Sequence, residues 1–173
     1  RPGSLLYAMG ITQHNRGHQN VLSCANLQML LGNMGKRGGG VNPLRGQNNV
    51  QGACDVGCLV NFYVGYQRVT DEAAQTKFRQ AWGRTSGLQV GLTVVEMINA
   101  AERGEIKGMF VLGENPAMTD PDINHARKVL REMDFLVVQE IFPSETTEYA
   151  HVILPGAAFA EKEGTFTNTE RRV

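Results

Sequence analysis

The chain has few of the residues that mark specialised classes of protein. Of 173 residues, three are cysteines and six are prolines, and lysine plus arginine equal aspartate plus glutamate at 17 each. Three cysteines exclude a disulfide framework and favour a reducing compartment. Zero net charge gives no basic field, so we expect no nucleic acid partner. No apolar run approaches the roughly 20 residues of a spanning helix, so we expect no direct membrane insertion, and we recognise no signal peptide.

The composition is that of an ordinary globular protein, with 42% hydrophobic and 20% charged residues. The length suits one sizeable domain or parts of two. The sequence begins at Arg1 without an initiator methionine and ends abruptly at Val173. We therefore expect a piece of a longer polypeptide.

The cysteines and histidines do not have the spacing of a metal site. Cys54 and Cys58 are four apart, which is not a usual zinc or iron–sulfur spacing, so we expect all three cysteines to be buried small hydrophobes. His14 and His18 can share one helix face, but Gly17 weakens that helix and no third ligand is evident. We expect no metal ligand among these residues.

The first half of the chain predicts a strand over residues 5–9, ending at Gly10, and a helix over residues 19–31. The apolar face of that helix is wide, so we expect the helix to be well buried. Glycines then fill residues 32–40 and end it. Two more helices are predicted over residues 71–82, capped by Thr70, and over residues 93–103, opened by a Thr93–Glu96 capping box. Residues 84–91 predict a loop.

The second half predicts an α/β fold. Strands are expected over residues 106–112, 135–142 and 151–154, separated by a helix over residues 120–133 and a helical turn over residues 144–149. Asp120 is the expected cap of the longer helix and Pro121 its first residue. The central strand is nearly all apolar, as in a sheet covered on both faces. This order predicts a parallel, doubly wound, Rossmann-like sheet.

Ligands of open parallel sheets bind at the carboxyl ends of the strands. One such end carries Gly113, Asn115 and Thr119 and leads into a helix N-terminus, which suits a phosphate or carbonyl oxygen. Without a GxGxxG pattern or a phosphate-loop lysine, a nucleotide-like ligand and a simple capped turn are equal alternatives. The first strand also ends in a polar segment, which contains Gln13.

Residues 41–52 contain the most unusual pattern in the chain. Arg45 is their only charged residue, and it stands among five side-chain amides, four of them at Gln47, Asn48, Asn49 and Gln51, and two glycines. Such amides both donate and accept hydrogen bonds. The pattern favours a polar pocket in which one guanidinium binds a small anion.

Three other features have simple interpretations. The carboxylates within residues 161–170 can suggest acid–base chemistry, but we favour a solvated turn that leads into a strand. His125 lies on a charged helix and is expected in solvent, and His151 opens a strand and is expected to be structural. No Ser–His–Asp grouping is suggested by the local sequence.

Several motifs together resemble a known family. The chain resembles the catalytic subunit of molybdenum- or tungsten-dependent formate dehydrogenase, a molybdopterin oxidoreductase of the dimethyl sulfoxide reductase group. The resemblance covers essentially the whole chain and rests on motifs in family order, namely Met9-Gly-Ile-Thr-Gln13, Gly32-Asn-Met-Gly35, Gly40-Val-Asn-Pro-Leu-Arg-Gly-Gln-Asn-Asn-Val-Gln-Gly52, Gly113-Glu-Asn-Pro116, Val152-Ile-Leu-Pro155 and Glu163-Gly-Thr-Phe-Thr-Asn168.

This resemblance implies a bis(molybdopterin guanine dinucleotide) cofactor with molybdenum or tungsten, held between two α/β domains. Residues 1–46 would end one domain, residues 47–159 would form most of the second, and residues 160–173 would start the return to the iron–sulfur end of the parent. The parent's metal ligand, a cysteine or selenocysteine, and its [4Fe–4S] cysteines match no residue here.

The resemblance also implies roles for individual residues. Gln47 would lie near the pterin, and Arg45 would lie beside the metal and orient formate. A guanidinium can hold both oxygens of formate through parallel N–H bonds, which lysine cannot do. Arg45 can alternatively pair with a cofactor phosphate or an interface carboxylate. The two guanosines would be bound at strand ends, one by Met9, Gly10 and Gln13, the other by Gly113, Asn115, Thr119 and Gln139.

The parent is thus expected to oxidise formate to carbon dioxide, or to run the reverse, while the isolated piece is expected to be inactive. Its implied partners are formate, the rest of its own subunit and electron-transfer subunits. The expected compartment is the cytoplasm, with the periplasm as the alternative. Two other functions stay open, namely another reductase of the group, such as one for nitrate or thiosulfate, and a non-catalytic structural subunit with the same fold.

Overall fold

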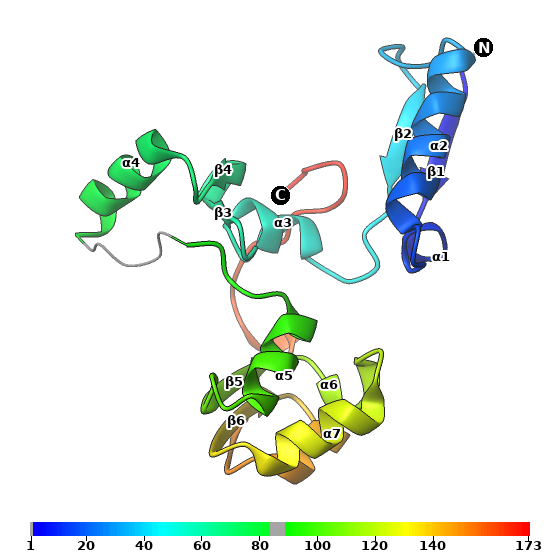
Figure 1. Cartoon of the computed structure of the whole chain (residues 1–173). Coiled ribbons are helices and arrows are strands. Elements are labelled where there is room, and N and C mark those ends of the chain that lie inside the picture. Colours follow the sequence, from blue (N-terminus) through cyan, green and yellow to red (C-terminus); the bar gives the residue numbers. More distant parts are fainter. Residues whose placement is uncertain (1, 84–88) are drawn as a thin grey trace. The chain divides into compact units, whose positions relative to one another are not determined.

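The computed structural model describes residues 2–83 and 89–173 and divides into two compact units (Figure 1). One unit contains Arg1–Ala74 and Thr165–Val173, and the other contains Gln75–Gly164. The loop expected over residues 84–91 lies largely outside the described residues. Each unit carries its own parallel sheet, which confirms the predicted α/β class.

The first unit begins with a strand–helix–strand crossover. Strands β1 (Ser4–Tyr7) and β2 (Gly40–Pro43) pair in parallel, with Tyr7 opposite Pro43. Helices α1 (Met9–Thr12) and α2 (Gly17–Leu30) connect them, and α2 lies along the two strands in Figure 1. At the first residue of α2, a Cβ would collide with the backbone of Thr12, so only glycine fits there.

Two expectations for this region were wrong, and one strand was not predicted. The first strand ends at Tyr7, and Met9 instead opens α1. Strand β2 was not expected at all, because only one of its four residues, Val41, has a strand-forming apolar side chain. Helix α2 is not well buried, since Leu30 is 84% exposed and only Gly17 and Gln28 are buried. Two strands cover one side of a helix and leave its other apolar side chains in solvent.

The rest of this unit begins with the short helix α3 (Val50–Asp55). A hairpin of two-residue strands follows that helix, and a longer helix then begins, capped by Asp71 rather than the expected Thr70, because the Ala74 amide donates to Asp71 Oδ1 at 2.9 Å. Residues 165–173 form no strand, contrary to expectation. The elements are α3 (Val50–Asp55), β3 (Phe62–Tyr63), η1 (Val64–Tyr66), β4 (Gln67–Arg68) and the start of α4 (Glu72–Trp82), most of which belongs to the second unit.

The second unit is built on a three-stranded parallel sheet in the order β5-β6-β7. Its core is apolar and fully enclosed, with Leu130, Leu136 and Val138 at 0% exposure. The elements are α5 (Val94–Glu102), β5 (Gly108–Leu112), α6 (Pro116–Thr119), α7 (Ile123–Glu132), β6 (Phe135–Glu140), η2 (Glu145–Tyr149), β7 (Val152–Pro155) and η3 (Phe159–Glu161).

The capping box of α5 is confirmed, with Glu96 N donating to Thr93 Oγ1 and Thr93 N to Glu96 Oε2. The cap of α7 is Asp122 rather than Asp120, because His125 N donates to its carboxylate at 3.2 Å. The expected cover on both sheet faces was wrong for the described residues. In β5, Val111 is buried whereas its neighbours Phe110 and Leu112 are 56% and 64% exposed, so one face of the sheet is open.

The predictions for the histidines and cysteines were confirmed only for His151. His151 is structural, as predicted, since its Nδ1 accepts from Leu136 N at 3.1 Å. His125 was expected in solvent but pairs with Glu102 at 3.0 Å across α5 and α7. The three cysteines are free but not buried, contrary to expectation, since Cys24 and Cys54 are partly exposed and Cys58 is exposed.

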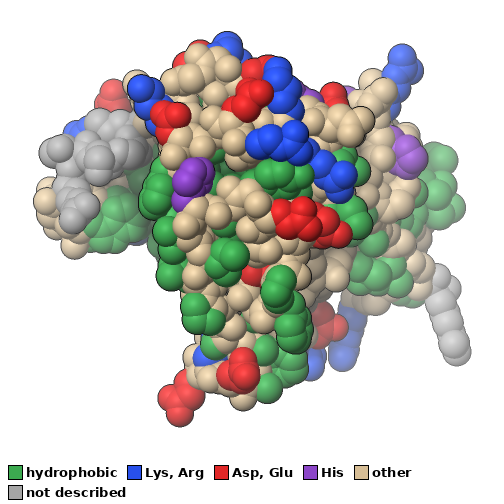
Figure 2. Space-filling view, turned by 90° about the horizontal axis from the view of Figure 1, so that it is seen from below, with side chains coloured by type: hydrophobic (Ala, Val, Ile, Leu, Met, Phe, Trp, Pro, Cys, Tyr) green, Lys and Arg blue, Asp and Glu red, His purple; other side chains and the backbone are tan. Residues whose placement is uncertain are grey.

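Within the described residues, no group of histidine, cysteine or carboxylate side chains could hold a metal ion. The helices of residues 2–83 and 89–173 are all too short or too polar to cross a bilayer. On the face seen in Figure 2, acidic and basic side chains are interspersed rather than separated by sign.

Candidate functional site

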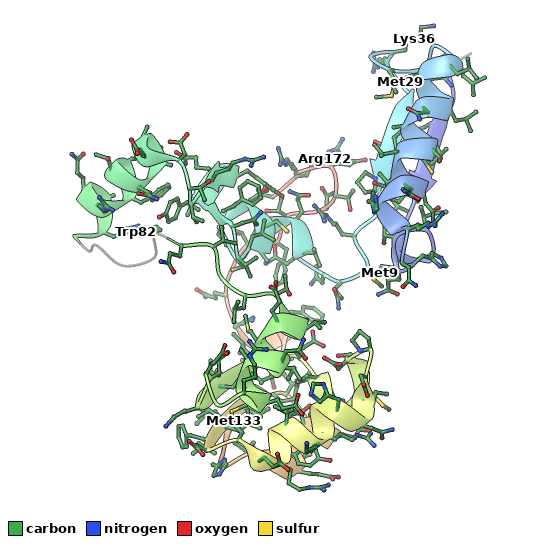
Figure 3. The ribbon with its side chains drawn as sticks, viewed as in Figure 1. Met9, Met29, Lys36, Trp82, Met133 and Arg172 are labelled. Atoms are coloured by element: carbon green, nitrogen blue, oxygen red, sulfur yellow. The ribbon has the colours of Figure 1, made fainter. Side chains whose placement is uncertain are left out.

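A hollow of about 360 Å³ opens at the carboxyl ends of β1 and β2. Both strands end at the same edge because they are parallel and in register from Ser4–Gly40 to Tyr7–Pro43. Figure 3 shows Met9 at this end of the β1–α2–β2 crossover and Lys36 at its opposite end. The hollow is lined by Tyr7, Ala8, Met9, Thr12, Pro43, Leu44, Arg45, Gly46, Gln47 and Val50. It therefore brings Met9 together with Arg45 and Gln47, which lie far from it in the sequence.

The Met9 side chain lies close to the Gly46 backbone in the lining of the hollow. A Cβ at Gly46 would lie 3.2 Å from Met9 Cε, so the thioether packs over bare backbone there. Gln13 Nε2 lies 3.4 Å from Met9 Sδ, which connects Gln13 to the same group. Nothing lies within 4 Å of a Cβ placed on Gly10. Small residues and polar side chains thus leave room at a strand end, which fits a flat polar ligand such as a pterin or a nucleotide base.

Arg45 has only part of its hydrogen-bonding capacity engaged. Its Nε and Nη2 donate to Gln51 Oε1 at 3.4 and 3.2 Å, and its backbone amide donates to Thr169 Oγ1 at 3.3 Å. A guanidinium has five N–H groups. Among the described residues, these two side-chain bonds leave the other three for a ligand. The side chain is held on one edge and open on the other.

Gln51 is the residue that sequence reasoning missed. It is 6% exposed, and its Nε2 donates to Asp55 Oδ1 at 2.9 Å and to the Tyr66 hydroxyl at 3.2 Å. The sequence showed Gln51 only as one of several side-chain amides near Arg45. A spacing of six residues from Arg45 gives no signal of contact, because residues 45–49 are irregular and α3 begins only at Val50.

The second expected cluster lies at the carboxyl ends of β5 and β6. Gly113 N donates to Gln139 O at 2.9 Å, and Gln139 Nε2 donates to Pro155 O at 3.3 Å. Thr119 Oγ1 lies 3.0 Å from Glu114 Oε1 and lines a separate hollow of about 250 Å³. The described structure thus places these residues at strand ends without bringing them into one hollow.

Both ends of the Asn115 side-chain amide make hydrogen bonds within the protein. Its Oδ1 accepts from Thr146 N and Thr146 Oγ1 at 3.2 and 2.7 Å, and its Nδ2 donates to Glu145 Oε2 at 2.7 Å. The side chain therefore ties the loop after β5 to η2. The Asn115 backbone is engaged as well, since its carbonyl accepts from Met118 N and Thr119 N, and the neighbouring Gly113 has φ of 61°.

The hydrogen bond from Asn115 lowers the pKa of the Glu145 carboxyl, with smaller contributions from its own backbone amide and the charge of Arg127. A lowered folded-state pKa stabilises the fold above the unfolded pKa of about 4.3 and is lost as pH falls through the folded value. Glu145→Gln should therefore destabilise the chain near neutral pH and not at low pH. Urea unfolding between neutral pH and pH ~3 measures this difference.

Glu163→Gln is the matched control, since Glu163 is exposed and makes no side-chain bond within the described structure. A Glu145→Gln effect that stayed constant down to the lowest pH would contradict the prediction, because it would mean that the charge of Glu145 has no part in it.

The chain is similar to known proteins over almost its whole length. Residues 4–173 match the family model described as molybdopterin oxidoreductase. The chain is 54% identical over 171 residues to F420-dependent formate dehydrogenase 1 subunit alpha of Methanococcus maripaludis, 46% identical over 169 residues to a putative formate dehydrogenase of Bacillus subtilis, and 42% identical over 172 residues to formate dehydrogenase H of Escherichia coli. Each match covers 98–99% of this chain and between 17% and 25% of the relative. The chain belongs to the molybdopterin oxidoreductase family.

Proposed function

We propose that this chain is part of the catalytic alpha subunit of a formate dehydrogenase, which oxidises formate to carbon dioxide or runs the reverse. The observation that carries the proposal is Arg45, held on one edge by Gln51 and open to a strand-end hollow on the other. Formate is a small anion with two equivalent oxygens. A guanidinium edge matches such an anion in both charge and shape.

Membership of the family implies a molybdopterin cofactor. We propose its bis(guanine dinucleotide) form with molybdenum or tungsten, with Met9, Gly10 and Gln13 at one guanosine and Gln47 near the pterin. The hollow at the ends of β1 and β2 supports this, because Gly46 in its lining exposes bare backbone and the Gln47 amide there can both donate and accept hydrogen bonds. When bound, the cofactor supplies the two-electron chemistry of formate oxidation.

The proposed contacts to the other guanosine come from the second unit, through Gly113, Asn115, Thr119 and Gln139. Since the Asn115 side-chain amide is bonded to Thr146 and Glu145, its proposed contribution is to hold the loop in shape. The proposed [4Fe–4S] centre and the cysteine or selenocysteine metal ligand belong to the parent outside these residues.

Arg45 would bind formate and fix its direction. Two parallel N–H bonds to the two oxygens leave the C–H pointing away from the guanidinium, and this orientation accounts for much of what a protein can add to such a reaction. The polar lining by Gln47 and Thr12 keeps the anion hydrated or hydrogen-bonded on entry.

We further propose that residues 1–46 end one cofactor-binding domain, residues 47–159 form the second, and residues 160–173 begin the return to the iron–sulfur end. The remainder of the subunit and electron-transfer subunits are the proposed partners. The free cysteines support a cytoplasmic location, with the periplasm as the alternative.

Substrate preference of the full-length subunit tests the proposal. We expect formate-dependent dye reduction to exceed any activity with nitrate or thiosulfate, and we expect molybdenum or tungsten and pterin in the purified protein. The reverse preference would assign it to another reductase of the group, and absence of metal and pterin would make it a structural subunit. The 173-residue chain alone should show no formate-dependent dye reduction.

A further inference from the structure

We propose that Gln51 is a positioning residue that fixes the guanidinium of Arg45, an inference that rests on the proposed function of Arg45. The Gln51 side chain is buried, yet its oxygen accepts from two nitrogens of Arg45. The contact is made on the inner edge of the guanidinium. The outer edge is thereby aimed at the hollow at the ends of β1 and β2.

The orientation of the Gln51 amide is itself determined by its surroundings. Its nitrogen faces two acceptors, the Asp55 carboxylate at 2.9 Å and the Tyr66 hydroxyl at 3.2 Å. A flipped amide would place its NH₂ group against the N–H groups of Arg45 and its oxygen against a carboxylate, so only one orientation satisfies all partners. Asp55 and Tyr66 therefore fix the orientation of the Gln51 amide, and the Gln51 oxygen in turn fixes the position of the Arg45 guanidinium.

A second layer holds these two acceptors. Arg171 Nη2 lies 3.5 Å from Asp55 Oδ1, and its guanidinium carbon lies 5.4 Å from the centre of the Tyr66 ring. Arg171 belongs to the C-terminal segment, in which Thr169 also accepts from the Arg45 amide. The segment of residues 165–173 thus contacts both Arg45 and the groups that orient Gln51.

Backbone strain is concentrated in the same place. The described residues other than glycine with positive φ are Asn49, Tyr66 and Arg171, at 60–61°. Tyr66 and Arg171 belong to the network just described, and Asn49 directly precedes α3 and accepts from Thr167 N at 3.0 Å. Such conformations cost about 1–3 kcal/mol each and persist where the surroundings over-determine them, often at functional sites.

The backbone at the start of α3 is closely packed against Asn49 and Thr167. A Cβ on Gly52 would collide with the Asn49 side chain and lie 3.3 Å from Thr167 Oγ1. The backbone on both sides of Gln51 is therefore fixed by Asn49 and Gly52. A change at Gln51 would be felt by Arg45 rather than absorbed by the helix.

The test uses the full-length, cofactor-loaded subunit. Gln51→Met keeps the length of the side chain and removes its hydrogen bonds. We expect kcat/KM for formate to fall about 10- to 100-fold, the cost of a misplaced group, with unchanged metal and pterin content. Tyr66→Phe, which removes one acceptor and keeps the ring, should cause a smaller loss in the same direction. Gln67→Met is the control, because Gln67 is half-buried in the same unit and bonds to Val64 O instead.

A double-mutant cycle separates positioning from general stability. In an Arg45→Met background, Gln51→Met should have little further effect, because residues that act through one another are not additive. A readout without turnover is the rate at which phenylglyoxal modifies Arg45, measured by mass spectrometry. Loss of the bonds from Gln51 should raise that rate several-fold, and Gln67→Met should not.

Different results would contradict the proposed function of Arg45 and the positioning role of Gln51. If Arg45→Met left the formate kinetics unchanged, the proposed function of Arg45 would be wrong. If Arg45→Met impaired turnover but Gln51→Met reduced it equally in both backgrounds, or left the modification rate of Arg45 unchanged, the positioning role would be overturned while the proposed function stood.

Discussion

Arg45→Lys in the full-length subunit is expected to lower kcat/KM for formate by about 10²- to 10³-fold, the range seen when a group that orients or stabilises the reacting species is lost. Lysine keeps the positive charge but cannot bond to Gln51 on one edge and to both formate oxygens on the other. Steady-state dye reduction at varied formate measures the effect. Since the loss is in orientation, we expect both kcat and KM to change.

The cofactor content decides what the result means. Metal and pterin should stay at the level of the unmutated subunit, because the strand-end hollow retains its other lining residues. Arg103→Lys is the matched control, since Arg103 is about half exposed and pairs only with Glu105 in the described structure. A fall in cofactor content in proportion to activity would show that Arg45 anchors the cofactor instead.

The second unit was largely predictable from its sequence because its core elements have strong local signals. The strands that became β5, β6 and β7 contain nearly continuous apolar residues, and Thr93 and Glu96 have the spacing of a capping box. The exposure of Phe110 and Leu112 was not predictable, because an apolar side chain reports its preference for burial and not whether anything covers it.

The first unit was less predictable because backbone contacts decide its structure. Strand β2 has one strand-forming residue, and its place is set by hydrogen bonds to β1 from across a 14-residue helix. The same crossover places Arg45 and Met9 in the lining of one hollow. The sequence indicated Arg45 by its isolation among amides, but it could not indicate Gln51, since burial of an amide depends on partners that lie 4 to 15 residues away.

Thr146 gives the largest expected effect on stability. The side chain is at 0% exposure, its hydroxyl donates to Asn115 Oδ1 at 2.7 Å, and it accepts from Ala117 N at 3.1 Å. Thr146→Val fills nearly the same volume and removes both bonds. The Ala117 amide would then be a buried donor without its partner, so we expect the free energy of unfolding to fall by about 2–4 kcal/mol from two lost bonds.

Urea unfolding followed by circular dichroism measures the total, and hydrogen exchange of the Ala117 amide reports the lost bond directly. A double-mutant cycle with Asn115→Ala should give a coupling of about 1 kcal/mol or more, because both side chains share one hydrogen bond. Thr70→Val is the control, since Thr70 is exposed. A change below about 0.5 kcal/mol, within the range of ordinary surface substitutions, together with unaltered exchange at Ala117, would mean that water replaces the hydroxyl and that Glu145 and the Thr146 backbone amide are enough to hold Asn115.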